Sequence, residues 1–254
     1  MKKLASFIPT HTTSREEVSK YFNKDSSLLF LLNNIDKVFF CFHDIQDIDY
    51  CKKIALNIRD NLKQVNFLLY KTPSFNLAFV SHLISLQKEG FTDLIYLPDD
   101  SACTTKNTFF IKEVLNYYKK NKDILFLSLT YKNLEFTKNN ILPNKTLHLN
   151  KKLSLSYFDS KDLRETKFID FINKPFIANI DLLLKLCDKT YSQLATKQEG
   201  DYYLRSQIVK KNNKIALLNK RLIRCFYYNS TNRDVRRKEL HIMRKLLQHK
   251  KSLV

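Results

Sequence analysis

The first half of the chain alternates short apolar segments with longer segments of helical periodicity, and this alternation restricts the possible folds most. Aromatic and β-branched residues mark the segments that we expect to be strands: residues 4–9, 37–44, 65–71, 93–100 and 123–131. Apolar residues at helical spacing mark the expected helices: residues 15–23, 48–62, 75–90 and 108–121. Gly90 is expected to end the third of these helices. Strands that alternate with helices are typical of a mostly parallel sheet flanked by helices, so we predict an α/β fold.

The pattern changes after Tyr131. Residues 132–174 are polar, with short strand-like pieces such as those at 146–150 and 153–158 and no clear alternation of strand and helix. Further along we expect these elements: helices at 178–189 and 199–212, a strand at 215–229, and a basic amphipathic helix at 233–251. No linker rich in Pro, Gly or Ser interrupts the chain, and no repeat is present. We therefore expect one domain over residues 1–230, with halves at 1–131 and 132–230, and a basic helical extension at 231–254.

The net charge favours a polyanionic partner. The chain has 44 Lys and Arg against 25 Asp and Glu, which gives a formal charge of +19. Such a charge suits nucleic acid, anionic lipid or phosphorylated small molecules. Lys and Asn are abundant along the whole chain, so a compositional bias explains part of the charge equally well. The charge alone does not select a partner.

The cysteines and the apolar segments indicate the compartment. The five cysteines are scattered and form no C-x-x-C pair, which argues against a disulfide framework and a structural zinc site. No apolar run has the length needed to cross a bilayer. The apolar stretch at the N-terminus is interrupted after Ile8, too early for the core of a signal peptide. We expect a cytoplasmic protein with reduced thiols.

Polar residues follow four of the expected strands. In parallel sheets ligands bind outside the carboxyl ends of the strands, and these ends lie along one edge. The residues expected at that edge are Pro9–Thr13 with His11, His43 and Asp44, Lys71–Asn76, and Asp99 with Asp100. Their convergence predicts a ligand site there.

The adjacent acids Asp99 and Asp100 suggest how a phosphate would be bound. The chain has two glycines and neither G-x-x-x-x-G-K-[ST] nor G-x-G-x-x-G, so a cradle of backbone amides is excluded on local pattern. The remaining way to bind a pyrophosphate is through a divalent cation held by carboxylates, and Mg²⁺ or Mn²⁺ prefers such oxygen ligands. A helix cap or a solvated turn is the simpler explanation of two adjacent aspartates, and the dipeptide alone does not decide between them.

The order of these segments resembles the nucleotide-sugar-binding half of GT-A glycosyltransferases of the family-two kind. The resemblance rests on Pro9–Thr13 after the first strand, Asp44 after the second and Pro98-Asp99-Asp100 after the fourth. It implies that Asp100 binds the metal and that Asp99 approaches the ribose, the metal or its water.

The same resemblance implies further donor contacts. Pro9 and Thr10 would lie against the nucleotide, and Asp44 would hydrogen-bond a uracil-type base. His11 and Lys71 belong to the same edge. Asn76 and His82 would stand near the diphosphate or the sugar, although the apolar helix face around His82 favours a hydrogen-bonded, half-buried histidine. Cys103 is not expected to act as a nucleophile, because no basic residue is evidently placed to lower the pKa of its thiol.

The second half resembles the acceptor side of the family. The segment at 197–219 is similar to the E-D-x-x-L-x-x-R block, which implies that Asp201 is the catalytic base, with Glu199 in reserve, and that Arg205 orients it or meets a phosphate. Three features depart from the family pattern, and the first is the absence of the glycines that are common in the family's third-strand loop. Pro98 stands where a first Asp is common, and no evident histidine follows the last strand; Asn229, Asn232 or His241 would have to replace it.

The expected activity is metal-assisted transfer of a sugar from a nucleoside-diphosphate donor to a hydroxyl acceptor, with inversion. The acceptor would be a glycan or lipid-linked glycan of the cell surface, and the C-terminal helix would touch an anionic membrane. Two alternatives remain open: a basic nucleic-acid-binding protein and a related α/β nucleotidyltransferase. Nucleic acid is not expected as a partner of the transferase.

Overall fold

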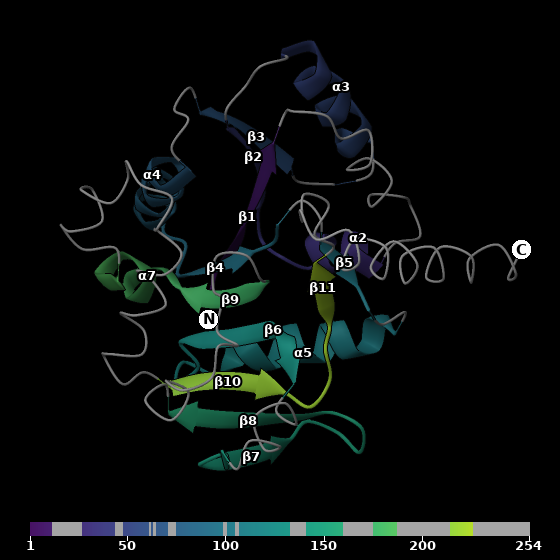
Figure 1. Cartoon of the computed structure of the whole chain (residues 1–254), viewed down its shortest axis with the longest axis vertical. Coiled ribbons are helices and arrows are strands. Elements are labelled where there is room, and N and C mark those ends of the chain that lie inside the picture. The colour runs from purple at the N-terminus through teal and green to yellow at the C-terminus, as the bar shows by residue number, and fades with distance from the viewer. Residues whose placement is uncertain are drawn as a thin grey trace, which may run out of the picture.

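The computed structural model describes residues 1–11, 27–43, 48–60, 62, 65–70, 75–98, 101–104, 107–132, 141–159, 175–186 and 214–225. These residues form a sheet of nine strands, a second sheet of two strands and helices on both faces of the large sheet (Figure 1). None of the helices in this part of the chain is long and apolar enough to cross a membrane.

The large sheet has the strand order β3-β2-β1-β4-β9-β6-β10-β8-β7. Its strands are β1 (Leu4–His11), β2 (Val38–His43), β3 (Val65–Tyr70), β4 (Asp93–Tyr96), β6 (Phe126–Lys132), β7 (Lys145–His148), β8 (Ser154–Asp159), β9 (Phe176–Asn179) and β10 (Lys214–Leu218). The small sheet pairs β5 (Ser101–Cys103) with β11 (Ile223–Cys225). The helices are α2 (Ser27–Asn33), α3 (Ile48–Arg59), α4 (Phe75–Lys88), α5 (Thr108–Lys120) and α7 (Ile180–Leu186).

The first four strands of the order form the parallel sheet that the alternating sequence pattern predicts. β1 pairs in parallel with β2 and with β4, and β2 pairs in parallel with β3. Helices separate the successive strands, because parallel neighbours need a crossover connection. The predicted α/β fold is confirmed.

The rest of the large sheet is mixed, which differs from the mostly parallel sheet that we expected. β9 runs antiparallel to both of its neighbours, β4 and β6. β10 is parallel to β6 and antiparallel to β8, and β8 is antiparallel to β7. The polar segment before β9 does not supply a helical crossover pattern, so the strand that follows is free to enter the sheet in the opposite direction.

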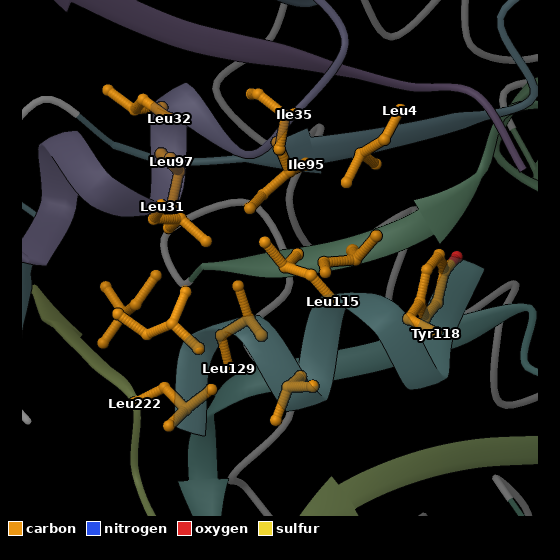
Figure 2. Close-up of a cluster of buried hydrophobic side chains, with 14 of the residues drawn as sticks. Leu4, Leu31, Leu32, Ile35, Ile95, Leu97, Leu115, Tyr118, Leu129 and Leu222 are labelled. Carbon is orange, nitrogen blue, oxygen red and sulfur yellow. The ribbon is translucent and has the colours of Figure 1, made fainter. Parts of the chain in front are cut away.

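Two apolar layers cover the faces of the sheet. Successive residues of β1 point to opposite faces, so Leu4 and Ile8 pack in one buried cluster and Ala5 and Phe7 in the other. The first cluster is closed by leucines of α2 and by α5, and Figure 2 shows Leu31 and Leu115 facing each other there. The second is closed by α4 and α7, which lie side by side (Figure 1).

The end of α4 has the geometry that its glycine predicts. Gly90 has φ of 77°, a conformation that residues with a Cβ rarely adopt. The Gly90 amide donates to the carbonyl of Gln87 at 3.0 Å, and the Phe91 amide donates to the carbonyl of Leu86 at 3.0 Å. This pair of bonds is the Schellman motif, and it turns the chain back toward β4.

Several expected elements change in the structure. Helix α2 and strand β5 were not expected, and the expected strand at 215–229 is divided between β10 and β11, which belong to different sheets. The expected helix at 178–189 begins later because Phe176–Asn179 forms β9. The expected helices at 15–23, 199–212 and 233–251 lie outside the described residues.

Candidate functional site at the carboxyl edge of the sheet

The carboxyl ends of β1, β2 and β3 lie level with one another. His11 at the end of β1 is in register with His43 at the end of β2, and His43 is in register with Tyr70 at the end of β3. The strand ends that the sequence predicted to meet therefore do meet at one edge of the sheet. Outside such an edge is where ligands bind in parallel α/β sheets.

The acidic pair follows β4 at the same edge. β4 pairs with β1 through Phe7 and Tyr96, and the Leu97 amide extends this pairing with a 3.1 Å bond to the carbonyl of Phe7. The Ser101 amide then donates to the carbonyl of Pro98 at 2.9 Å. This bond joins the residue before the acidic pair to the residue after it, while Asp99 and Asp100 themselves lie outside the described residues.

The two-stranded sheet of β5 and β11 anchors the chain directly after the acidic pair. Ser101 is in register with Cys225 and Cys103 with Ile223. The Thr104 amide donates to the carbonyl of Leu222 at 2.8 Å, and the Thr104 hydroxyl donates to the carbonyl of Arg221. These bonds join the segment that carries the acids to a strand more than a hundred residues away, which the sequence did not reveal.

The underside of this small sheet is apolar. Cys103, Ile223 and Leu222 surround a void of about 10 Å³ together with Leu31 and Leu129. Burial raises the pKa of the Cys103 thiol to about 12. Cys103 is therefore a protonated packing residue, as the sequence predicted, and the void is too small to hold a substrate.

His82 lies in the core and away from the edge. Its ring is 1% exposed and packs between the rings of Phe7 and Phe39, with centroids 5.2 Å and 4.8 Å away. The His82 Nε2 lies 3.2 Å from the carbonyl oxygen of Ser6, which can only accept, so Nε2 carries the proton. Burial lowers the pKa of His82 to about 4, so the ring is neutral near pH 7. This confirms the packing role and removes His82 from the residues near a diphosphate.

The structure describes part of the candidate donor site. Pro9 is buried in β1, in register with Cys41. Thr10 and His11 close the same strand, and Asn76 belongs to the first turn of α4. The remaining predicted site residues lie outside the described residues: Asp44, Lys71, Asp99, Asp100, Glu199 and Asp201. Their roles stay predictions.

One strand pairing directly after the acidic pair in the sequence was missed by the sequence interpretation. Arg224 of β11 is in register with Ala102 of β5, two positions after Asp100. The alternating segment at 222–225 was a signal for a strand, but nothing in the sequence indicated that it would pair with the residues after the acids. No group of three or more His, Cys, Asp or Glu suited to a metal occurs among the described residues.

Comparison with known proteins identifies the fold class. No protein-family model and no curated protein sequence matches the chain. The mannosyltransferase PcManGT from Pyrobaculum calidifontis, solved in complex with GDP-Man and Mn²⁺, matches with a TM-score of 0.53 at 9% identity over 90% of this chain and 58% of that one. S. aureus TarS 1-349 matches with a TM-score of 0.52 at 13% identity over 87% of this chain and 59% of that one.

A third solved structure is matched over its whole length. It is a CMP:2-keto-3-deoxy-manno-octonic acid synthetase complexed with CTP, with a TM-score of 0.50 at 10% identity over 96% of this chain and 100% of that one. The chain thus spans less than two thirds of PcManGT and TarS but all of the synthetase. The chain has the α/β fold of these solved structures, with a large central sheet flanked by helices, in agreement with the GT-A-like fold expected from the sequence.

Proposed function

We propose that the chain is a glycosyltransferase that moves a sugar from a nucleoside-diphosphate donor to an acceptor hydroxyl. The observation that supports this most is the location of the acidic pair in the chain. It falls between β4 and β5, is spanned by the Pro98–Ser101 hydrogen bond of 2.9 Å, and follows a strand that pairs with β1. Acids that follow a strand at the carboxyl edge of a sheet are suited to a ligand. They are not needed to start the next helix, because Asn107 is the N-cap of α5.

The donor side of the site would use the strand ends. Asp100 and Asp99 would hold Mn²⁺ or Mg²⁺, because both ions prefer carboxylate oxygens. Such an ion would offset the negative charge of the departing nucleoside diphosphate. Pro9, Thr10 and His11 of β1 would lie along the nucleotide. The parallel pairing of β1 with β2 supports a role for Asp44 at the base, since Asp44 directly follows His43.

Two further residues complete the donor side of the proposal. Lys71 directly follows Tyr70, the last residue of β3, and Asn76 belongs to the first turn of α4. β3 is the outer neighbour of β2 at the same edge. A lysine and an amide at this point suit the diphosphate and the sugar hydroxyls, because both groups donate hydrogen bonds.

The acceptor side of the proposal rests on the second half of the chain. Asp201, or Glu199 in its place, would take the proton from the acceptor hydroxyl. The acceptor oxygen would then form a bond to the anomeric carbon while the bond from that carbon to the diphosphate oxygen breaks, which inverts the configuration. The residues after this segment form β10, which pairs with β6 at the end of the donor half, and this continuity supports a shared site.

We also propose that residues 1–230 act as one domain. The large sheet runs without interruption from β3 in the first half to β7 and β10 in the second, and β9 lies between β4 and β6. Residues 231–254 would form a basic helical extension that touches an anionic membrane surface where a lipid-linked acceptor is found.

Nucleotide-dependent thermal stabilisation tests the donor class. A ligand that binds only the folded state raises the melting temperature. We expect UDP or GDP with Mn²⁺ to raise it, and the same nucleotides with EDTA to have a smaller effect. Slow hydrolysis of the matching nucleotide sugar, detected as released nucleoside diphosphate, would identify the donor. Absence of both effects across the nucleoside diphosphates would contradict the proposal.

A nucleotidyltransferase is the second candidate, and one observation favours it. The chain covers the CMP-sugar-acid synthetase completely but covers only 58% of PcManGT. The two activities differ in the released product. A nucleotidyltransferase would consume CTP or another nucleoside triphosphate together with a sugar substrate and release pyrophosphate, whereas the glycosyltransferase would release a nucleoside diphosphate. Assaying both products with the same preparation separates the two candidates.

The nucleic-acid-binding alternative is tested independently. Binding through the +19 charge would fall steeply as salt is raised, because it releases counterions from the phosphates. We expect no tight binding to random duplex DNA at physiological salt. Tight, salt-sensitive binding without any nucleotide-dependent stabilisation would favour this alternative.

A further inference from the structure

The outer face of α5 carries lysines and one exposed aromatic ring. The opposite face of this helix is buried in the first apolar cluster. Residues that recur every three or four positions lie on the same side of a helix. Four exposed side chains of α5 recur in this way and form a single stripe: Phe109, Lys112, Asn116 and Lys120.

The turn between β7 and β8 lies beside this stripe and adds to its positive charge. Asn150 of the turn donates a hydrogen bond from its side-chain amide to the Oε2 atom of Glu113. Glu113 is the only acid of α5 and is half-buried. Lys151 and Lys152 follow Asn150 with exposed side chains, so the turn brings two further lysines close to the outer face of the helix.

Lys220 adds a fifth lysine at the first turn of α5. Its Nζ atom lies 4.3 Å from the centre of the Phe110 ring, and the centres of the Phe110 and Phe109 rings are 6.5 Å apart. Lys220 belongs to the segment between β10 and β11, so three parts of the chain that are distant in sequence contribute to one surface. We call it the basic α5 surface, and its members are Phe109, Lys112, Asn116, Lys120, Lys151, Lys152 and Lys220.

The lysines of the basic α5 surface are not neutralised within the described part of the chain. Four lysines outside this surface form ion pairs with acids: Lys2, Lys37, Lys52 and Lys119. No ion pair joins a lysine of the basic α5 surface to a described carboxylate. The surface contains no arginine, whose planar fork is the better group for individual phosphates, as in nucleic acid. Lysines act as point charges and suit the diffuse negative potential of an anionic bilayer.

We propose that the basic α5 surface docks the protein on an anionic lipid bilayer, with the Phe109 ring entering the headgroup layer. Such docking is driven by electrostatic attraction together with burial of apolar area, and the five lysines supply the first and Phe109 the second. Phe109 is 57% exposed and is the only aromatic residue among the large hydrophobic residues that are exposed in the described part of the chain. It lies in the first turn of α5, the end of the helix that follows the acidic pair and β5 in the chain. The inference needs neither acid and does not use the basic extension at 231–254.

Vesicle flotation of the full-length chain tests the surface. We expect binding to phosphatidylcholine vesicles that contain phosphatidylglycerol, and a loss of this binding as salt is raised, because exposed charges are screened. Lys112→Gln with Lys120→Gln should weaken the binding by about tenfold or more, since one lysine near an anionic surface contributes about fivefold. The matched control is Lys52→Gln with Lys53→Gln, which removes two exposed lysines from α3, beside β3 at the end of the large sheet (Figure 1). The extension at 231–254 is present in every variant, so its own contribution cancels in the comparison.

A fluorescent reporter tests the apolar contact. The chain contains no tryptophan, so Phe109→Trp introduces a single one at the exposed position of α5. Anionic vesicles should shift its emission to shorter wavelength, and brominated lipid should quench it, because the ring leaves water for the headgroup layer. Leu56→Trp is the control, since Leu56 is 61% exposed on α3, and its emission should not change.

Three outcomes would overturn the proposal. The first is vesicle binding that the two pairs of lysine substitutions weaken equally, or that neither pair weakens. The second is an emission of Phe109→Trp that anionic vesicles leave unchanged. The third is a wild type that binds duplex DNA through the same lysines and binds no vesicles, which would make the basic α5 surface a nucleic-acid surface. None of these measurements involves a nucleotide or a metal ion, so they are separate from the test of the proposed transferase.

Discussion

Tyr118 of α5 donates a 2.7 Å hydrogen bond to the Oδ1 atom of Asp93, the first residue of β4. Asp93 is fully buried and forms an ion pair with Lys2, whose Nζ lies 3.5 Å from the same oxygen. The Lys2 Nζ also lies 3.8 Å from the centre of the Tyr118 ring. Burial raises the pKa of Tyr118, with a further rise from Asp93, so the phenol keeps its proton. Asp93, Tyr118 and Lys2 lie at the amino end of β4, whereas the acidic pair follows its carboxyl end, and their contacts join the N-terminus to the core.

Tyr118→Phe should lower the free energy of unfolding by about 1–3 kcal/mol. The substitution keeps the ring in the buried cluster but removes the hydroxyl donor, so the buried carboxylate loses a partner. Urea denaturation measures the change. Asn116→Ala, at an exposed position of the same helix, is the control and should have little effect. The Thr92 hydroxyl also donates to the Oδ2 atom of Asp93, at 2.6 Å. Equal stability of Tyr118→Phe and the wild type would show that Lys2 and Thr92 are sufficient partners for the Asp93 carboxylate.

Stability should fall as the pH is lowered from 6.5 to 4, in part because of His82. The folded-state pKa of His82 is about 4, below the usual value of 6.5, so the unfolded chain binds a proton more readily in this window. The stability that His82 contributes is therefore fully present above pH 6.5 and is lost toward pH 4, by about 3 kcal/mol at most.

His82→Gln isolates this contribution, because glutamine can still donate to the carbonyl of Ser6 but does not titrate. The difference in unfolding free energy between wild type and variant should shrink from pH 7 to pH 4. His148→Gln replaces an exposed histidine and should leave the pH profile unchanged. Parallel profiles for His82→Gln and wild type would mean that the fold does not lower the pKa of the ring.

Asp100→Asn should abolish the stabilisation by nucleotide and Mn²⁺ while leaving the melting temperature of the free chain unchanged. An amide oxygen is a weaker ligand for a hard divalent ion than a carboxylate. Asp60→Asn is the control, because Asp60 is an exposed acid just after α3. Full retention of metal-dependent nucleotide binding in Asp100→Asn would refute the metal role.

Thr104→Val should weaken nucleotide binding with Mn²⁺ more than it lowers stability. The valine keeps the shape of threonine but cannot donate to the carbonyl of Arg221, so the link between β5 and β11 loosens. We expect a cost of about 1 kcal/mol in unfolding free energy. Thr104→Ser retains the hydroxyl and should restore both quantities. A stability loss without any change in nucleotide affinity would indicate that the small sheet does not position the acids.

Asp201→Asn should reduce the turnover rate by about 10²–10⁴-fold while leaving donor binding intact, which is the usual range for loss of a general base. Steady-state kinetics together with nucleotide titration separate the two effects. Glu199→Gln is the paired variant. If Glu199→Gln shows the large loss and Asp201→Asn does not, the base is Glu199.

The elements that the sequence predicted well are those whose signal is local. α4 has helical periodicity and a glycine at its end, and the structure gives Phe75–Lys88 followed by Gly90 with φ of 77°. β2 and β3 are rich in β-branched and aromatic residues and appear where expected. The meeting of their carboxyl ends with that of β1 followed from the parallel pattern alone.

The elements that were missed depend on contacts distant in sequence. β5 has three residues, too few for any periodicity, and is a strand only because β11 pairs with it. β9 has four residues, and the sequence pattern placed part of it in a helix. Its strand conformation and its direction depend on hydrogen bonds to β4 and β6, which are distant in sequence. α2 was not expected because its leucine run was too short to show a face; burial of four of its leucines against the sheet stabilises it.

β9 has a consequence for any attempt to divide the protein. Its four residues pair with β4 on one side and with β6 on the other. A fragment truncated after residue 131 would lack this shared strand and would leave two rows of unpaired amides and carbonyls in the middle of the molecule. Unprotected sheet edges recruit other chains, so such a fragment should aggregate and would not survive as an independent nucleotide-binding module.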